Sequence, residues 1–386
     1  MLKEYTNHNN MKKASVGIII LCIAIIGAFF LWRSLDKEPK TISVEKDPLV
    51  IGLSLGTIRT ERWLKDRDFI IEKAKEMGAV VNVTMSDDNA EMQISQIENL
   101  ISQGVKVIIV VSSDSEKLSK AVDIANNAGV KIIAYDRLIT GSKDYDYYIT
   151  FDNYKVGQFQ GKAIESALKL SAATKAAPKY ITLFAGSPTD NNAKVFFDGA
   201  IDVLRPYVEK GALVIVGPAP LKSSDDAFTK ITTENWRADV AKTRMENLLN
   251  NDAKSVVLDA ILAPNDTLAR AIIEACSTDA KYPAGKLPVI TGQDGEVASI
   301  AAIRDGKQNM TVFKDTRNLA MATIALADAL LKGEEPSIKG ARLDTTSYDT
   351  GKKVVKAYLL EPVIVTKDNY KTVLIDSGYY KEADIK

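Results

Sequence analysis

The chain has 386 residues, of which 46% are hydrophobic and 26% are charged, and its 50 basic and 50 acidic side chains cancel to a net charge of zero. This length suggests two domains, and the balanced charge does not favour a nucleic-acid partner. The single histidine, His8, leaves the region from residue 49 onward without an imidazole for general-base catalysis or metal binding. Because Cys22 lies in an apolar run and Cys276 stands alone, an internal disulfide and a cysteine metal site are excluded, and we predict no metal and no cofactor.

An uncharged apolar run extends from Ala14 to Trp32, just after two lysines. As a helix it would reach roughly 28 Å, about the hydrocarbon thickness of a bilayer. The positive charge before it predicts a cytoplasmic amino terminus (1–13), one transmembrane helix (14–32), a polar tether (33–48) and an extracytoplasmic remainder. We therefore expect a single-pass protein of the cell membrane that contacts the lipid bilayer through this run.

A cleaved signal peptide and a lipoprotein signal both fit this run less well. A cleaved signal peptide has a shorter apolar core followed by a small-x-small site, whereas here the apolar run continues to Trp32. A bacterial lipoprotein needs small residues before its cysteine, whereas Ile20 and Leu21 precede Cys22. The pattern favours an uncleaved signal anchor.

From Leu49 onward, short apolar runs alternate with amphipathic segments, which predicts repeated strand–helix units around buried parallel sheets. The expected strands are 49–55, 80–84, 105–111, 131–135, 147–151, 180–184, 213–216, 256–262, 289–291 and 310–313, with a last apolar run at 357–365. The expected helices are 69–77, 92–101, 118–128, 154–170, 194–204, 236–250, 268–276 and 319–331. Two such sheets in tandem predict an α/β protein of two lobes with a cleft between them.

Polar and aromatic side chains follow the predicted strands, at the carboxyl ends where open α/β sheets bind their ligands. The candidate ligand-binding residues are Arg62, Trp63, Asp136, Arg137, Asp190, Asn192, Trp236, Asn265, Asp294 and Lys314. Carboxylates accept hydrogen bonds from hydroxyl groups, Arg and Lys donate them, and an Asn amide does both. Indole rings can cover the apolar C–H faces of a pyranose. The set predicts a cleft for a neutral polyhydroxylated molecule.

Each residue of this kind also suits a simpler structural role. Two other protein classes, a glycosidase and a transcription regulator, are also considered. Asp190 and Asp266 suit helix N-caps, and Trp236 suits a core position. Asp136 and Asp294 would serve as a glycosidase pair, but nearby Arg and Lys residues would keep both ionised, so we expect no enzyme. A transcription regulator would need a basic helix-turn-helix before residue 49, where the apolar run stands instead.

Several stretches resemble those of the periplasmic sugar-binding proteins of the ribose and galactose type, and most closely the D-xylose-binding members. They are Glu61–Trp63 with Lys65–Asp68, Ser95–Asn99, Ala134–Arg137, Phe151–Asn153 with Lys155–Gly157, Gly186–Pro188 with Asp190–Lys194, Asn265–Asp266, Gly292–Asp294 and Thr311–Lys314. The resemblance extends from about Pro48 to the end, and segment 221–235 departs from it.

The resemblance implies a type I periplasmic binding protein, with two Rossmann-like lobes joined by a three-crossing hinge. The first lobe would comprise 49–153 and about 314–350, and the second 154–313 and about 351–386. Hydroxyl groups of the sugar would bond to Arg62, Asp136 and Arg137 from the first lobe. From the second lobe and hinge they would bond to Asp190, Asn192, Asn265, Asp294 and Lys314. Trp63 and Trp236 would sandwich the ring.

Family members bind sugar without changing it, and they are usually secreted or lipid-anchored. The apolar run of this chain resembles instead the members that act as sugar sensors for a membrane histidine kinase. We therefore expect a membrane-anchored D-xylose receptor that closes on its ligand, or on a related monosaccharide, and signals to a two-component sensor kinase. The alternative is the substrate-binding component of an ABC importer, with a permease as partner, because a tethered receptor suits both roles.

Overall fold

A computed structural model describes residues 27, 31, 33, 49–218, 221, 224–283 and 286–385. The chain from Pro48 onward forms one compact unit. The predicted transmembrane helix lies almost wholly outside the described residues. Within the described residues, no helix combines the length and the apolar character needed to cross a membrane.

In the described part of the chain, the first sheet has seven strands in the order β11-β12-β5-β4-β3-β1-β2. The strands are β1 (Leu49–Leu55), β2 (Ala79–Met85), β3 (Val107–Val111), β4 (Lys131–Tyr135), β5 (Tyr147–Phe151), β11 (Arg342–Asp344) and β12 (Lys356–Leu360). They pair in parallel except for β11, which runs antiparallel to β12.

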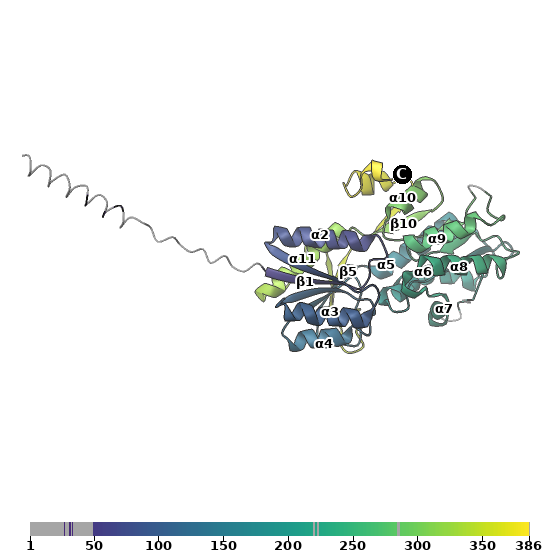
Figure 1. Cartoon of the computed structure of the whole chain (residues 1–386). Helices are drawn as coiled ribbons and strands as arrows, with labels where there is room; N and C mark the ends of the chain where they lie inside the picture. The colour runs from purple at the N-terminus through teal and green to yellow at the C-terminus, as the bar shows by residue number, and fades with distance from the viewer. Residues whose placement is uncertain are drawn as a thin grey trace, which may run out of the picture. The chain divides into compact units, whose positions relative to one another are not determined.

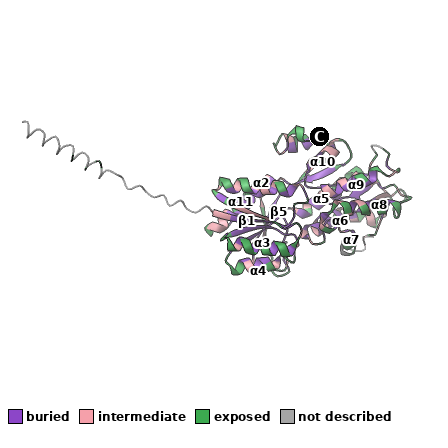
Figure 2. Cartoon of the chain, in the orientation of Figure 1, coloured by how far each residue is buried: buried purple, intermediate pink, exposed green. Residues whose placement is uncertain are grey.

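Helices cover both faces of this sheet because successive strand residues point to opposite sides. Ile109 and its face-mates pack against α2 (Arg62–Glu76) and α11 (Thr316–Lys332). Ile108 and Val110 pack on the other side against α3 (Ala90–Ser102) and α4 (Ser119–Asn127). Figure 1 shows the two helix layers on either side of the strands, and Figure 2 shows their outer surfaces exposed.

The second sheet has, among the described residues, four parallel strands in the order β7-β6-β8-β9. They are β6 (Lys179–Leu183), β7 (Leu213–Ile215), β8 (Ala260–Leu262) and β9 (Val289–Ile290). The helices of this lobe are α5 (Asn153–Ala167), α6 (Asn191–Glu209), α7 (Ser224–Ile231), α8 (Ala238–Asn250), α9 (Asp266–Ser277) and α10 (Val297–Arg304). An antiparallel pair, β10 (Met310–Phe313) with β13 (Val363–Thr366), completes it.

Within the described residues, the chain passes between the two lobes at three places. It leaves the first sheet after β5 to enter α5, returns from β10 to α11, and leaves again from β12 to β13. The crossings are residues 151–153, 313–316 and 360–363. This arrangement agrees with the expected fold of two lobes joined by a three-crossing hinge.

The structure corrects three expectations about strand, lobe and helix boundaries. The run 357–365 is not one strand, because Pro362 has no N–H for a ladder and the chain changes sheet there. Its first half, β12, pairs with β5, so residues up to Leu360 belong to the first lobe rather than to the second. Trp236 does not begin the long helix: it ends a 3₁₀ turn (η2, Glu234–Trp236), and α8 starts at Ala238.

Helices α5 and α6 approach each other through glycines. A Cβ atom added to Gly157 would lie 1.9 Å from the carbonyl oxygen of Phe196, and one added to Gly199 would lie 2.2 Å from that of Tyr154. Backbone atoms cannot move aside as a flexible side chain would, so the absence of a side chain sets the spacing of these helices. Phe196 also lines the cavity described below.

We expect Gly157→Ala to lower the free energy of unfolding by roughly 2–3 kcal/mol, because the new methyl group forces the helices apart. Denaturant unfolding monitored by circular dichroism measures the change. The matched control is Ser166→Ala on the exposed side of the same helix, which should shift stability by less than about 0.5 kcal/mol. Equal stability of the two variants would contradict the close helix contact.

Candidate ligand-binding site

A small cavity of about 30 Å³ lies where the carboxyl ends of the strands in the two lobes face each other. All ten candidate residues line it, and the structure brings every one of them together. The lining also includes three residues that the sequence reasoning did not select, namely Thr60, Phe196 and Gln293. Of these, Gln293 lies between Gly292 and Asp294 in a matched stretch, and Phe196 follows Asn192 at helical spacing, so both carried a usable signal.

Most cavity residues follow a strand and lie at or near the start of the next helix, whereas Trp236 follows α7 and ends a 3₁₀ turn. Asp190 precedes α6 and accepts a hydrogen bond from the Asn192 backbone N–H (3.0 Å). Asn265 precedes α9 and accepts one from the backbone N–H of Leu268 (3.0 Å). The N-cap role and the cavity position therefore both hold for Asp190. Asp266, by contrast, does not line the cavity.

A buried ion cluster centred on Arg62 spans the two lobes. Its guanidinium Nη1 lies 3.0 Å from Asp136 Oδ2 and 3.6 Å from Asp294 Oδ1, and its Nε donates to Asp66 Oδ2 at 3.1 Å. Lys314 Nζ lies 3.0 Å from the same Asp294 oxygen. The side chains in these contacts are at most 6% exposed, so the charges neutralise one another with little help from water.

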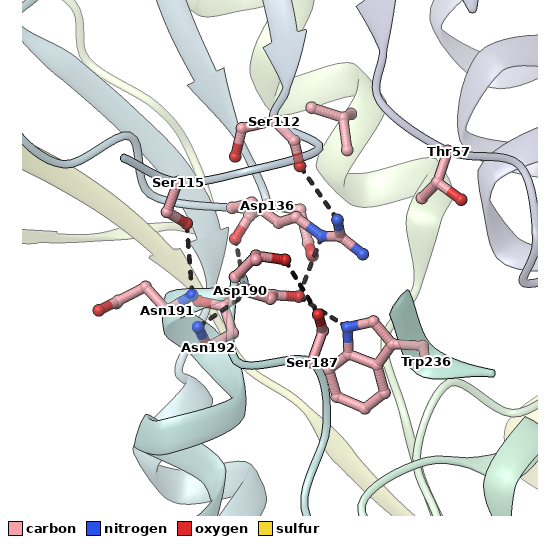
Figure 3. A network of polar contacts seen from close by, with 12 residues as sticks. Thr57, Ser112, Ser115, Asp136, Ser187, Asp190, Asn191, Asn192 and Trp236 are labelled. Atoms are coloured by element: carbon pink, nitrogen blue, oxygen red, sulfur yellow. Dashed lines mark hydrogen bonds and ion pairs between the residues drawn. The ribbon is translucent and has the colours of Figure 1, made fainter. Parts of the chain in front are cut away.

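A second ion pair joins the two lobes at the cavity. Arg137 Nε lies 3.0 Å from Asp190 Oδ2, and Arg137 also donates to the Ser112 carbonyl (3.0 Å). Nearby, Asn192 of the second lobe donates to the Asp136 carbonyl of the first at 2.8 Å. Figure 3 shows Asp136, Asp190 and Asn192 grouped beside Trp236.

The charges of this cluster favour the ionised forms of Asp136 and Arg62, whereas burial raises the pKa of Asp66. Burial tends to raise the pKa of the Asp136 carboxyl, but the cations Arg62, Lys314 and Arg137 outweigh burial and lower it. Burial likewise opposes the charge of Arg62, but Asp136, Asp66 and Asp294 raise its pKa well above the usual value. A glycosidase general acid needs a raised pKa, so Asp136 is unsuited to that role.

The two cavity tryptophans differ in their surroundings. The ring of Trp63 faces the guanidinium carbons of Arg62 and Arg137, at 4.4 and 5.3 Å from its centroid. Trp236 donates from Nε1 to Asp190 Oδ2 at 3.2 Å, and its ring packs so closely on Gly186 that a Cβ there would lie 2.1 Å from it. The expectation that both rings sandwich a sugar stays a prediction.

Six buried polar atoms of cavity-lining residues have no hydrogen-bond partner among the described residues. Three of them, Asp136 Oδ2, Arg137 Nε and Asp294 Oδ1, are held in ion pairs. The three without an ion pair are Arg62 Nη2, Trp63 Nε1 and Gln293 Oε1. Buried polar groups are nearly always paired, so such atoms are expected to meet a polar ligand. Two donors and one acceptor match the capacity of hydroxyl groups, which accept and donate.

Three cavity residues adopt a backbone conformation that side-chain-bearing residues rarely take. The φ angles are +59° for Asp136, +54° for Trp236 and +95° for Asp294. Backbone bonds hold the two aspartates, from Asp136 N–H to the Ile149 carbonyl and from Asp294 N–H to the Val312 carbonyl, both at 2.8 Å. Such strain concentrates at functional sites, where the surrounding structure must sustain it.

Comparisons with known proteins agree with this fold and cavity. Residues 51–335 match the family model described as a periplasmic binding protein domain. The chain is 40% identical to the multiple sugar-binding periplasmic receptor ChvE of Rhizobium radiobacter, over 88% of this chain and 93% of that one. It is 38% identical to the D-xylose-binding periplasmic protein of Escherichia coli, over 87% and 92%.

A solved structure shows the same architecture. An ABC transporter solute-binding protein from Clostridium phytofermentans with bound β-D-glucose superposes with a TM-score of 0.80 at 39% identity, covering 87% of this chain and all of the other. Fold and cavity thus define a two-lobed α/β binding protein. The chain belongs to the type I periplasmic binding proteins, in the sugar-binding family that includes xylose, ribose and multiple-sugar receptors.

The lowered pKa of Asp136 predicts a pH-dependent contribution to stability. A carboxyl whose folded-state pKa lies below its unfolded value, about 3.9, stabilises the fold above that pH and loses its contribution as the pH falls through the folded pKa. Asp136→Asn should therefore lower the free energy of unfolding by about 3 kcal/mol at pH 7, and the difference should shrink below about pH 4. Urea unfolding between pH 2.5 and 7 measures it.

The control for this series is Asp239→Asn, whose partner Arg237 lies in solvent. An exposed pair contributes little, so this variant should follow the wild type at every pH. A difference for Asp136→Asn that stays constant down to pH 2.5 would contradict the ionised, cation-paired state of that residue.

Proposed function

We propose that this chain is a receptor for a monosaccharide, D-xylose, which binds in the cavity between the two lobes. The observation that carries this proposal is the set of buried, unpartnered atoms on Arg62, Trp63 and Gln293, three residues that line a cavity built from hydrogen-bonding side chains of both lobes. A sugar offers hydroxyl groups to all three. Its C–H faces suit the indole rings of the lining.

The charge of the cavity favours a neutral ligand. Among the described lining residues there are three cations and three carboxylates: Arg62, Arg137, Lys314, Asp136, Asp190 and Asp294. An anionic or cationic ligand would leave one charge of this buried set without compensation, and an unpaired buried charge is strongly unfavourable. A hydroxylated ring adds no net charge and accepts or donates at each position.

Binding would act by bringing the lobes together. Arg62 and Arg137 come from the first lobe, whereas Asp190 and Asp294 come from the second, so a ligand that bonds to both sets stabilises the closed arrangement. A ligand shifts such an equilibrium only by its differential affinity for the two states. The three hinge crossings supply the segments about which the lobes rotate.

D-xylose is proposed over hexoses because the matched stretches resemble those of xylose-binding members of the family, and the 38% identity to the D-xylose-binding protein of Escherichia coli supports this choice. The solved relative holds β-D-glucose, which differs from xylose by a hydroxymethyl group. A single methylene changes affinity by about 1–3 kcal/mol, and the hydroxymethyl group is larger than a methylene and also brings a hydroxyl that needs a hydrogen-bond partner when buried. Xylose and glucose are therefore the pair of ligands that defines the specificity of this cavity.

Isothermal titration of the full chain in detergent with D-xylose, D-glucose, D-ribose and L-arabinose tests the ligand. We expect D-xylose to bind most tightly. Arg62→Ala and Asp294→Asn should each weaken binding by about 3 kcal/mol, or more than about a hundredfold, because each leaves buried partners unpaired. Arg59→Ala is the control, since Arg59 pairs with Asp87 and Asp88 outside the cavity. No binding of any sugar at millimolar concentration would reject the proposal.

We further propose that the apolar run 14–32 anchors the receptor in the cell membrane, with the lobes outside, and that the closed state signals to a membrane histidine kinase. The length of that run and the lysines before it support the anchor. The competing role, delivery of sugar to an ABC permease, is favoured by the solved relative, which is named as an ABC transporter solute-binding protein.

Extraction of membranes with alkaline carbonate should leave the full chain in the pellet, whereas Ile19→Arg with Ile25→Arg should release it, because two charges oppose insertion of the helix. Deletion of the gene then separates the two roles. Loss of a xylose-induced transcriptional response with normal uptake of labelled xylose supports signalling. Loss of uptake itself supports the importer and overturns the sensor role.

A further inference from the structure

The C-terminal segment contacts both lobes next to the cavity, through Tyr379 and Tyr380. It follows β13, lies beside α10 in Figure 1, and belongs to an apolar cluster with Ile300, Phe313 and Leu374. Neither tyrosine lines the cavity. Both, however, touch segments that carry cavity residues.

Tyr380 holds the strained turn on which Asp294 lies. Its hydroxyl donates to the Gly295 carbonyl at 2.8 Å, and Tyr380 is only 7% exposed. Asp294 and Gly295 both have positive φ, +95° and +71°, so this turn needs external contacts to persist. The other contacts come from Val312, Thr311 and Asp266, which belong to the second lobe.

The ring of Tyr380 reaches the helix on which Arg62 lies. Lys65 Nζ lies 3.9 Å from the centroid of that ring, which is a cation–π contact across the two lobes. Lys65 is three residues after Arg62 on α2 and therefore one turn away. Arg62 and Asp294 face each other at 3.6 Å, so Tyr380 connects from outside the two elements whose charged ends meet inside the cavity.

Tyr379 adds a third connection. Its hydroxyl is 2.8 Å from Thr316 Oγ1, and its ring packs edge-on against Phe313 with centroids 4.7 Å apart. These two residues flank Lys314, which completes the ion cluster with Asp294. The two tyrosines therefore contact the immediate surroundings of Arg62, Asp294 and Lys314.

We propose that Tyr380 is a positioning residue of the ligand site, which holds the Asp294 turn against the Arg62 helix and so sets the geometry of the cavity and its affinity. The proposal rests on the proposed sugar-binding function, since affinity is its main readout. Tyr379 supports it by fixing the crossing that carries Lys314.

The test compares Tyr380→Phe, which keeps the ring and loses the hydroxyl, with Tyr380→Leu, which loses both contacts. Tyr370→Phe is the matched control, because Tyr370 is buried in the same cluster but makes no hydrogen bond to a cavity loop among the described residues. In titrations of the full chain in detergent with D-xylose, Tyr380→Phe should weaken binding about tenfold and Tyr380→Leu more. Circular dichroism without sugar should show Tyr380→Phe and the control both folded at the temperature of the titration.

Two results would overturn the proposal: wild-type affinity in Tyr380→Phe, or a loss of affinity that Tyr370→Phe shares. Acrylamide quenching of tryptophan fluorescence in sugar-free protein gives an independent reading, since Trp63 and Trp236 line the cavity. Quenching should increase in Tyr380→Phe and not in the control. If the wild type binds no sugar, the proposed function fails, and quenching alone decides the positioning role: equal quenching in the three proteins rejects it.

Discussion

The structure depends on how one buried arginine is neutralised. The Arg62 guanidinium, removed from water, contacts Asp66, Asp136 and Asp294. Burial of an ion costs several kcal/mol, and only well-placed partners offset that loss. Asp66 and Asp136 come from the same lobe as Arg62, but Asp294 comes from the other. The contact between Arg62 and Asp294 forms only when the lobes meet, and it links the electrostatics of the cavity to the conformation of the whole molecule.

Two properties of the backbone bring these charged residues together at the cavity. Parallel sheets place the carboxyl ends of all their strands on one edge, so residues distant in sequence arrive at the same cavity. Three of them, Asp136, Trp236 and Asp294, also need positive φ to face it. Strain of this kind persists only where neighbouring contacts sustain it. Side chains outside the cavity supply some of these contacts, as Tyr380 does when it donates to the Gly295 carbonyl beside Asp294.

Most residues of the site could be predicted from the sequence, because the end of an apolar run shows where a buried strand ends and the polar residues after it begin. Apolar runs marked β1, β4 and β6, and the polar residues after them lie in the cavity as expected. The predicted element boundaries were wrong where tertiary structure overrides the periodicity of the sequence. The left-handed turn at Asn235 ends the helical path before α8, so Trp236 lies outside that helix. Strands β12 and β13 read as one run, because periodicity cannot show that a chain changes sheet. The membrane anchor stays a prediction.

The distances within the ion cluster indicate which contact a sugar would replace. Lys314 and Asp294 are 3.0 Å apart, within hydrogen-bonding range, whereas Arg62 and Asp294 are 3.6 Å apart, beyond it. Arg62 also keeps Nη2 unpartnered among the described residues. A hydroxyl group between Arg62 and Asp294 would accept from the first and donate to the second, and it would break no good hydrogen bond in doing so. The loosest contact of the cluster is thus also the one that spans the lobes, and a ligand placed there would strengthen the connection between them.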